Sequence, residues 1–331
     1  MPTLLGQQIG PVGFGLMGLT RPISPVDQEE AFAAMNAAIE NGATYWNGGQ
    51  FYGTSERNSL HLLRDYFRKY PEKASKVTLA IKGARVMEAA TVSFDGSEAG
   101  VRKSVDECNR ILDGTKSLDI FECARVDPKT PIEETMRALG LLVKEGKIKG
   151  IGLSEVKAET IRRAAKVQTI TQVEVELSLW SPDILYNGVV ATCTELGIPI
   201  IAYAPLSRGG LTTDLPEKEE DLPAHLKMYP RFQGDAFQAN QQLTQEVQKL
   251  ASDKQCTVPQ IAIGWVRAQS QRNGNGIIIP IPGAEKPEWV AENCRDIKLV
   301  EEDLQKIDEI LRRIPIKGGR YGPNESKLSE G

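Results

Sequence analysis

Lys82 and Tyr52 are the two side chains whose types and positions are best suited to proton chemistry. Lys82 ends the apolar run at 78–81, and lysines are seldom buried without a task. Tyr52 follows Asn47, the residue that ends another β-rich run. A cation beside a phenol favours the phenolate, so the two residues predict a tyrosine that exchanges protons with help from a lysine. The plainer alternatives are a salt bridge at a strand end for Lys82 and packing against Phe51 for Tyr52.

These residues belong to a chain in which short β-rich runs alternate with segments of 3.6-residue periodicity. The eight runs are 11–15, 43–47, 76–83, 117–124, 148–154, 170–180, 198–206 and 276–283. The helix over 26–42 should start after Ser24 as its N-cap, with Pro25 at the first helical position. Strict alternation implies parallel strands joined by right-handed crossovers. Eight units most simply close into a (β/α)8 TIM barrel, an α/β fold, with a doubly wound sheet as the alternative.

Several segments fall outside this alternation. Residues 1–10 should form a hairpin that plugs the barrel floor. Residues 207–239 are too long for an ordinary connection, and they follow the seventh strand, so we expect a long loop over the C-terminal face. A helix over about 301–313 should pack outside, and residues from about 318 to 331 should form a flexible tail. We predict that residues 1–331 make one barrel domain.

The segment GFGLMG (13–18) matches the glycine pattern of a dinucleotide-binding loop. That motif requires a helix to begin within it, whereas Pro22 and Pro25 delay the helix here, and the second strand ends at Asn47 instead of a carboxylate. The match therefore does not predict a Rossmann fold. In a barrel, the glycines would let the backbone approach whatever lies above the first strand.

The amino-acid composition limits which partners and which cellular compartment we expect for the protein. A net charge of −4 and a pI near 5.6 do not predict binding to nucleic acid or to an anionic membrane. No apolar run has the length of a membrane helix, and the first residues lack the pattern of a secretory signal. Five scattered cysteines predict reduced thiols in a cytoplasmic or nuclear protein. With only two histidines, neither a histidine-rich metal site nor a Ser-His-Asp triad is expected.

Four further motifs lie in order at the predicted strand ends: GLSE (152–155), QVE (172–174), YAPL (203–206) and IPGA (281–284). Together with Tyr52 and Lys82, they resemble the aldo-keto reductases over nearly the whole chain. That family has an Asp, a Tyr, a Lys and a His as a catalytic tetrad, and here Asn47 and Ala124 stand in place of the Asp and the His. The replacements, together with GFGLMGLT near the start, are most similar to the fungal pyridoxal reductases.

The resemblance implies NADPH-dependent reduction of an aldehyde to a primary alcohol, with pyridoxal and pyridoxine as the pair, and so a place in vitamin B6 metabolism. Tyr52 would protonate the carbonyl oxygen, Lys82 would lower the pKa of Tyr52, and Asn47 would accept a hydrogen bond from Lys82. The alternatives are a broad-specificity aldehyde reductase and an NADPH-binding regulatory subunit with little turnover. The partner expected is a small aldehyde, and the sequence is compatible with a monomer.

The resemblance also implies which residues would bind the cofactor NADPH. Ser154 and Gln172 would hold the carboxamide, and Tyr203 would stack on the nicotinamide. The pyrophosphate would be wrapped by Pro205, Leu206, Ser207 and Arg208. The adenosine phosphate would lie by Gly283, Ala284 and Lys286, with Glu292 and Asn293 on the adenine. Since Trp289 stands where several relatives carry Arg, the preference for NADPH over NADH depends on Lys286.

Glu122 shares a strand face with Ala124, because alternate residues of a strand point to the same side. If Ala124 occupies the inward His position, Glu122 also points into the barrel, where it should be paired or neutral. We expect Glu122 to reach Lys82 directly or through water and to supply the charge that Asn47 lacks. A protonated Glu122 bonded to neighbouring polar groups, or an outward-facing one, is the alternative.

Overall fold

The computed structural model describes residues 1–23, 26–87 and 92–322. Its central sheet has eight strands, all parallel, and each pairs with its neighbour along the chain. They are β3 (Phe14–Gly15), β4 (Tyr45–Gly49), β5 (Thr78–Gly83), β6 (Ile120–Cys123), β7 (Gly150–Ser154), β8 (Gln172–Glu176), β9 (Ile200–Tyr203) and β10 (Ile278–Ile281). Each overlaps one of the eight predicted runs, so the (β/α)8 prediction is confirmed.

The first and last strands meet through the glycines of GFGLMG. Gly13 donates its N–H to Pro280 O at 2.9 Å, and Gly15 donates to Pro282 O at 3.1 Å. A Cβ on Gly13 would lie only 2.8 Å from both the Ile281 side chain and Tyr45 O. The glycines therefore let β3 approach β10 and close the barrel. The segment opens only a short 3-10 helix, Met17–Thr20, and the first α-helix begins at Gln28.

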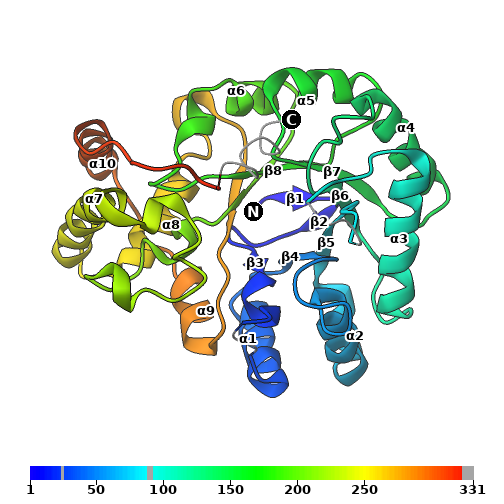
Figure 1. Ribbon diagram of the computed structural model, residues 1–331, viewed down its shortest axis with the longest axis horizontal. Coiled ribbons are helices and arrows are strands. Elements are labelled where there is room, and N and C mark those ends of the chain that lie inside the picture. The colour runs from blue at the N-terminus through cyan, green and yellow to red at the C-terminus, as the bar shows by residue number, and fades with distance from the viewer. Residues whose placement is uncertain (24–25, 88–91, 323–331) are drawn as a thin grey trace.

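Helices surround the barrel on all sides (Figure 1). They are α1 (Gln28–Glu40), α2 (Ser59–Lys69), α3 (Glu98–Leu112), α4 (Ile132–Lys144), α5 (Ala158–Ala165), α6 (Val189–Glu195), α7 (Gly234–Asp253), α8 (Val258–Ala268), α9 (Pro287–Cys294) and α10 (Glu301–Arg313). Helix α1 is capped by Asp27, whose carboxylate accepts from the N–H groups of Glu29 and Glu30. The expected cap at Ser24 and Pro25 lies outside the described residues.

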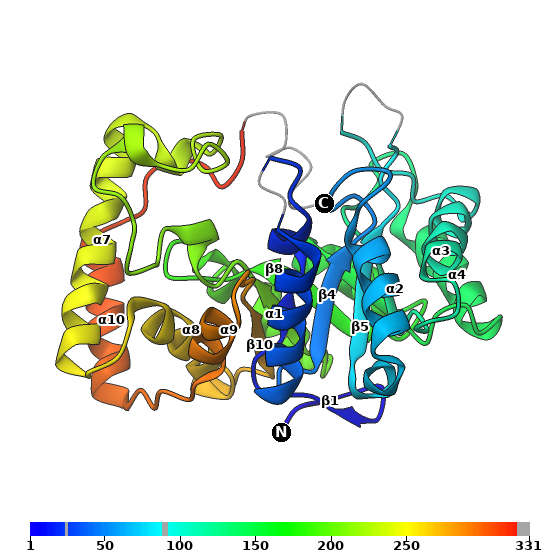
Figure 2. The same ribbon diagram turned by 90° about the horizontal axis from the view of Figure 1, so that it is seen from below.

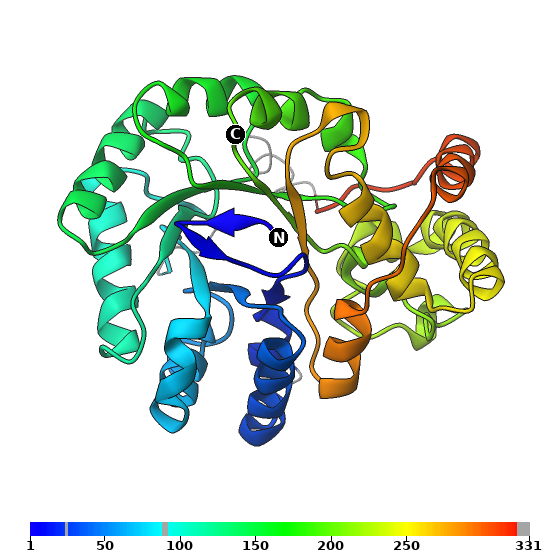
Figure 3. The ribbon, with the colours of Figure 1, turned by 180° about the vertical axis from the view of Figure 1, so that it is seen from behind.

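The floor of the barrel is apolar and is closed by a hairpin, as predicted. Strands β1 (Thr3–Leu4) and β2 (Gln7–Gln8) pair antiparallel and lie across the barrel axis (Figure 3). Leu4 and Ile9 pack on a cluster inside the barrel. That cluster consists of Tyr45, Ala80, Ile120, Ile201, Ile279 and Ile281. The charged side chains of Lys82, Glu122 and Glu174 lie further along their strands than this apolar layer.

The opposite end carries the long connections (Figure 2). Residues 207–239 contain short 3-10 turns and lead into α7. His225 Nε2 lies 3.4 Å from Nη1 of Arg21, so this segment lies over the C-terminal end of the barrel and reaches the loop after β3. Residues 318–322 of the expected tail also pack here, and 323–331 lie outside the described residues. No helix of the described chain has the length and hydropathy to cross a membrane.

Candidate active site

Tyr52 and Lys82 meet at the C-terminal ends of β4 and β5. Lys82 is buried on β5, and its Nζ lies 5.9 Å from the ring centroid of Tyr52, which follows β4 in a turn over Gly49. The Tyr52 ring also packs edge-on against Phe51, with centroids 5.1 Å apart. Tyr52 therefore makes both of the contacts considered from the sequence: it packs against Phe51, and it lies beside Lys82.

Asn47 connects Lys82 to two buried carboxyl groups. Its Oδ1 accepts from Lys82 Nζ at 2.8 Å, while its Nδ2 donates to Glu122 Oε1 at 3.1 Å and to Glu174 Oε2 at 2.6 Å. The lysine on Oδ1 fixes the orientation of the amide, and both amide hydrogens are then used. Asn47 therefore holds Lys82 from one side and the two glutamates from the other.

Glu122 is the partner of Lys82 that the strand alternation predicted. The two residues are level in neighbouring strands, and Glu122 Oε1 lies 3.3 Å from Lys82 Nζ. Lys82 makes a second and closer ion pair with Glu174 on β8. The sequence reasoning missed Glu174, although QVEVE places alternate glutamates on the inward face. Gly152 leaves room for this cluster, because a Cβ there would lie 2.9 Å from the Cβ of Glu122.

The buried carboxyl groups and Lys82 change one another's pKa. Burial and the nearby Glu122 raise the pKa of Glu174 well above its usual range, so a proton shared within the carboxyl pair is favoured. Burial acts to lower the pKa of Lys82, but Glu174, Tyr52 and Glu122 outweigh it and raise that pKa overall. Lys82 therefore remains an ammonium ion, and the excess negative charge around it is reduced by protonation.

Tyr52 keeps its proton at neutral pH in this environment. Burial raises its pKa, the positive charge of Lys82 opposes that rise, and Glu174 and Glu122 add to it. Ala124, at the end of β6, is buried and presents only a methyl group where the related tetrad has an imidazole. Tyr52 thus carries its proton beside a lysine ammonium ion, and the side chain at position 124 offers it no hydrogen-bonding group.

The residues expected to bind the cofactor lie around the mouth, at the ends of β7 to β10. Ser154 and Gln172 are fully buried, and within the described residues Ser154 Oγ and Gln172 Oε1 have no hydrogen-bond partner. A carboxamide offers one acceptor and two N–H donors, so a hydroxyl and an amide oxygen fit such a group. The Gln172 Nε2 is already used, because it donates to Tyr45 Oη at 2.7 Å.

The remaining expected cofactor residues divide between the turn after β9 and the segment that runs from the end of β10 through α9. The turn holds Tyr203, Pro205, Leu206, Ser207 and Arg208, and Arg208 pairs with Glu176 at 3.1 Å. Gly283, Ala284 and Lys286 follow β10, while Glu292 and the buried Asn293 lie on α9 itself. Lys286 is exposed at the N-terminus of α9, with Nζ 4.7 Å from the ring centroid of Trp289.

Comparisons with known proteins agree with these features. A model of the Aldo/keto reductase family matches residues 11–312. The chain is 41% identical to the probable pyridoxal reductase 2 of Schizosaccharomyces pombe, over 99% of this chain and 100% of that protein. It is 35% identical to the putative pyridoxal reductase of Saccharomyces cerevisiae, over 93% and 95% of the two chains. The solved structure of the glycerol dehydrogenase AKR11B4 from Gluconobacter oxydans shares the fold, with a TM-score of 0.79, 24% identity, and coverage of 96% and 95%.

Proposed function

Because the chain belongs to the aldo/keto reductase family of NAD(P)-dependent oxidoreductases, we propose that it uses NADPH to reduce the aldehyde of pyridoxal to a primary alcohol, giving pyridoxine. The observation that carries this proposal is the protonated Tyr52 beside the buried Lys82 ammonium ion. The substrate is taken from the two relatives, whose names describe pyridoxal reductases at 41% and 35% identity.

NADPH, when bound, supplies the hydride to the carbonyl carbon. Tyr52 hydrogen-bonds the carbonyl oxygen and delivers its proton as negative charge develops there. Lys82 then stabilises the phenolate that remains, because it is held close by Asn47, Glu122 and Glu174. The product is the alcohol, and one proton from solvent restores Tyr52. Ser154 Oγ and Gln172 Oε1 are the groups that would hold the carboxamide of the cofactor.

Arg125 is the group best placed to favour pyridoxal over simple aldehydes. It follows Ala124 and is half-buried. Its charge is close enough to act on the pKa of Tyr52. Its guanidinium donates to Ala124 O at 2.5 Å and to a phenolic oxygen, that of Tyr321, at 3.2 Å. Pyridoxal carries a phenolic oxygen beside its aldehyde. Arg125 would donate a hydrogen bond to that phenolic oxygen while Tyr52 donates one to the carbonyl oxygen.

The proposal is tested by the loss of NADPH absorbance when pyridoxal is added, compared with benzaldehyde and short aliphatic aldehydes at equal concentrations. We expect the highest kcat/KM for pyridoxal. Equal values across the panel would favour a broad aldehyde reductase instead. Tight NADPH binding with no turnover of any aldehyde would favour a regulatory subunit.

A further inference from the structure

The segment after α10 is fixed to the outer wall before it reaches the mouth of the barrel. Lys317 N donates to Asn240 Oδ1 at 2.8 Å, and Asn240 Nδ2 donates to Lys317 O at 2.9 Å. Arg231 Nε donates to Gly318 O at 3.1 Å. Asn240 is fully buried on α7, so the chain enters this region at a defined point. Arg320 and Tyr321, which follow, form a segment that we name the strap.

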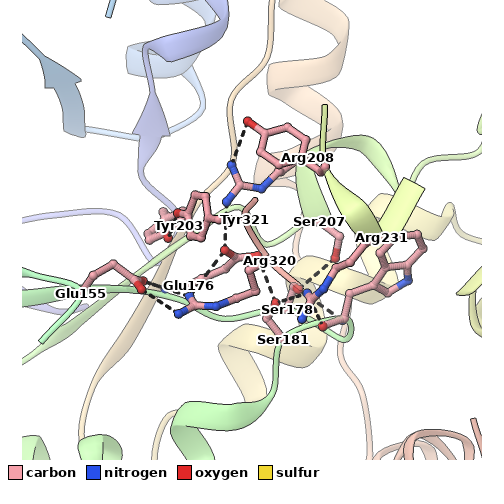
Figure 4. Close-up of polar contacts among 12 residues, drawn as sticks. Glu155, Glu176, Ser178, Ser181, Tyr203, Ser207, Arg208, Arg231, Arg320 and Tyr321 are labelled. Atoms are coloured by element: carbon pink, nitrogen blue, oxygen red, sulfur yellow. Dashed lines mark hydrogen bonds and ion pairs between the residues drawn. The ribbon is translucent and has the colours of Figure 1, made fainter. Parts of the chain in front are cut away.

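Arg320 binds two glutamates that end strands of the barrel (Figure 4). Its Nη2 and Nη1 donate to the two carboxylate oxygens of Glu155 at 2.8 and 3.2 Å, and Nη1 lies 3.6 Å from Glu176 Oε2. Both carboxylates are almost fully buried. A fork of this kind is among the stronger hydrogen-bonded ion pairs. Glu155 directly follows Ser154, which is assigned to the carboxamide of the cofactor.

Tyr321 lies between the residues expected at the nicotinamide and those expected at the pyrophosphate. Its hydroxyl lies 2.6 Å from the hydroxyl of Tyr203, which is assigned to the nicotinamide. Its ring centroid lies 4.7 Å from the guanidinium carbon of Arg208, which is assigned to the pyrophosphate. Figure 4 shows the Tyr321 side chain between these two residues. A dinucleotide that reaches from Tyr203 to Arg208 would have to occupy the same space.

We propose that the strap is an autoinhibitory contact: Arg320 and Tyr321 occupy the cofactor site, and NADPH binds only after they leave it. This inference rests on the proposed function, because the cofactor site is the one that it assigns. The closed strap lowers the apparent affinity for NADPH by the fraction of molecules that are open. Strap opening would then precede binding and limit its rate.

The test measures NADPH binding without turnover, by the fluorescence of bound NADPH. The double variant Arg320→Ala/Tyr321→Ala should bind NADPH at least about tenfold more tightly than the wild type, as expected if roughly nine molecules in ten are closed. In stopped flow, the wild-type association rate should level off with NADPH concentration, and the variant should bind faster without a plateau. Arg313→Ala, an exposed arginine paired with Glu246 on the outer wall, is the matched control and should behave like wild type.

A second readout uses the unaltered chain. If the strap leaves its site, saturating NADPH should speed tryptic cleavage after Arg320. Weaker NADPH binding by the double variant, or protection of that bond by NADPH, would overturn the proposal, because the strap would then close over the cofactor. Equal affinities of variant and wild type would also overturn it. Failure of both proteins to bind NADPH would instead refute the proposed function.

Discussion

Asn47 makes contacts that an aspartate at the same position could not make. Its amide donates to Glu122 and Glu174 while its oxygen accepts from Lys82. A third carboxylate here would face the two glutamates and raise the cost of burying them. We therefore interpret Asn47 and Glu122 as a matched exchange, in which the negative charge has moved from β4 to β6 and still lies beside Lys82.

This exchange predicts that replacing Glu122 shifts the pH dependence of kcat/KM. Glu122 acts to raise the pKa of Tyr52, so Glu122→Gln should lower that pKa. Reduction requires protonated Tyr52, and the alkaline limb of kcat/KM should therefore move to lower pH. Adding Asn47→Asp returns a carboxylate to Lys82 and should move the limb back. The exposed Glu98→Gln is the control, and an unmoved profile in Glu122→Gln would refute the exchange.

Arg125 predicts a substrate-specific effect. Arg125→Met keeps much of the side-chain volume but removes the charge, so it should raise the KM for pyridoxal about tenfold or more, since a hydrogen bond to a charged group contributes roughly 1.5–3 kcal/mol. The KM for benzaldehyde, which has no phenolic oxygen, should change little. Arg110→Met on the exposed side of α3 serves as control. Equal increases for both aldehydes would mean that Arg125 does not recognise the phenolic oxygen.

At the scale of elements, the sequence was informative where a pattern repeats. Strand and helix periodicity located all eight strands, and period-two alternation placed Glu122 on the inward face. The same alternation applied to QVEVE would have found Glu174, the closer partner of Lys82. The glycines of GFGLMG were located correctly, but their role in closing the barrel against β10 depends on a strand more than 260 residues away in the chain. Local patterns do not specify such a pairing.

The start of α9 predicts the choice of nucleotide. Lys286 lies exposed at a helix N-terminus, a position that favours an anion, and we assign it to the 2′-phosphate. Lys286→Ala should raise the KM for NADPH about tenfold, the loss of one charge-assisted contact, and leave the KM for NADH nearly unchanged. Lys298→Ala, in the exposed loop after α9, is the matched control. Equal effects on both nucleotides would place Lys286 away from the 2′-phosphate.

At the scale of the whole molecule, the two ends of the barrel have different tasks. The mouth holds the buried charges of the site, and the floor is apolar with the hairpin beneath it. One polar group near the floor joins neighbouring strands: Asp119 accepts from Leu79 N at 2.9 Å, from Lys116 at 2.6 Å and from Lys149 at 2.7 Å. Residues at this end are expected to serve stability rather than catalysis.

Asp119→Asn tests whether residues at the floor of the barrel serve stability and not catalysis. It leaves the buried Lys116 without its charge partner and should lower the free energy of unfolding by about 3–5 kcal/mol, while kcat for pyridoxal stays near wild type. Asp106→Asn breaks an exposed pair with Lys147 and should cost no more than about 1 kcal/mol. The measurement is denaturant unfolding with a parallel activity assay. A large fall in kcat in an Asp119→Asn protein that is still folded would mean that this residue of the floor also serves catalysis.

The strap was beyond the reach of sequence reasoning, which predicted a flexible tail from about residue 318. Its polar, glycine-rich composition gives no periodic signal. The contacts of Arg320 and Tyr321 exist only because the ends of β7, β8 and β9 present Glu155, Glu176 and Tyr203 together. Such a contact is set by the closed barrel as a whole, and not by the segment itself.

In the proposed mechanism, Tyr52 donates the proton in NADPH-dependent reduction of pyridoxal. Its most direct test is Tyr52→Phe, measured by pyridoxal-dependent oxidation of NADPH together with NADPH binding. Removal of one general acid typically costs about 10²–10⁴-fold, so kcat/KM should fall by that factor while the Kd for NADPH stays within about twofold of wild type. Turnover close to wild type in Tyr52→Phe would contradict proton donation by Tyr52.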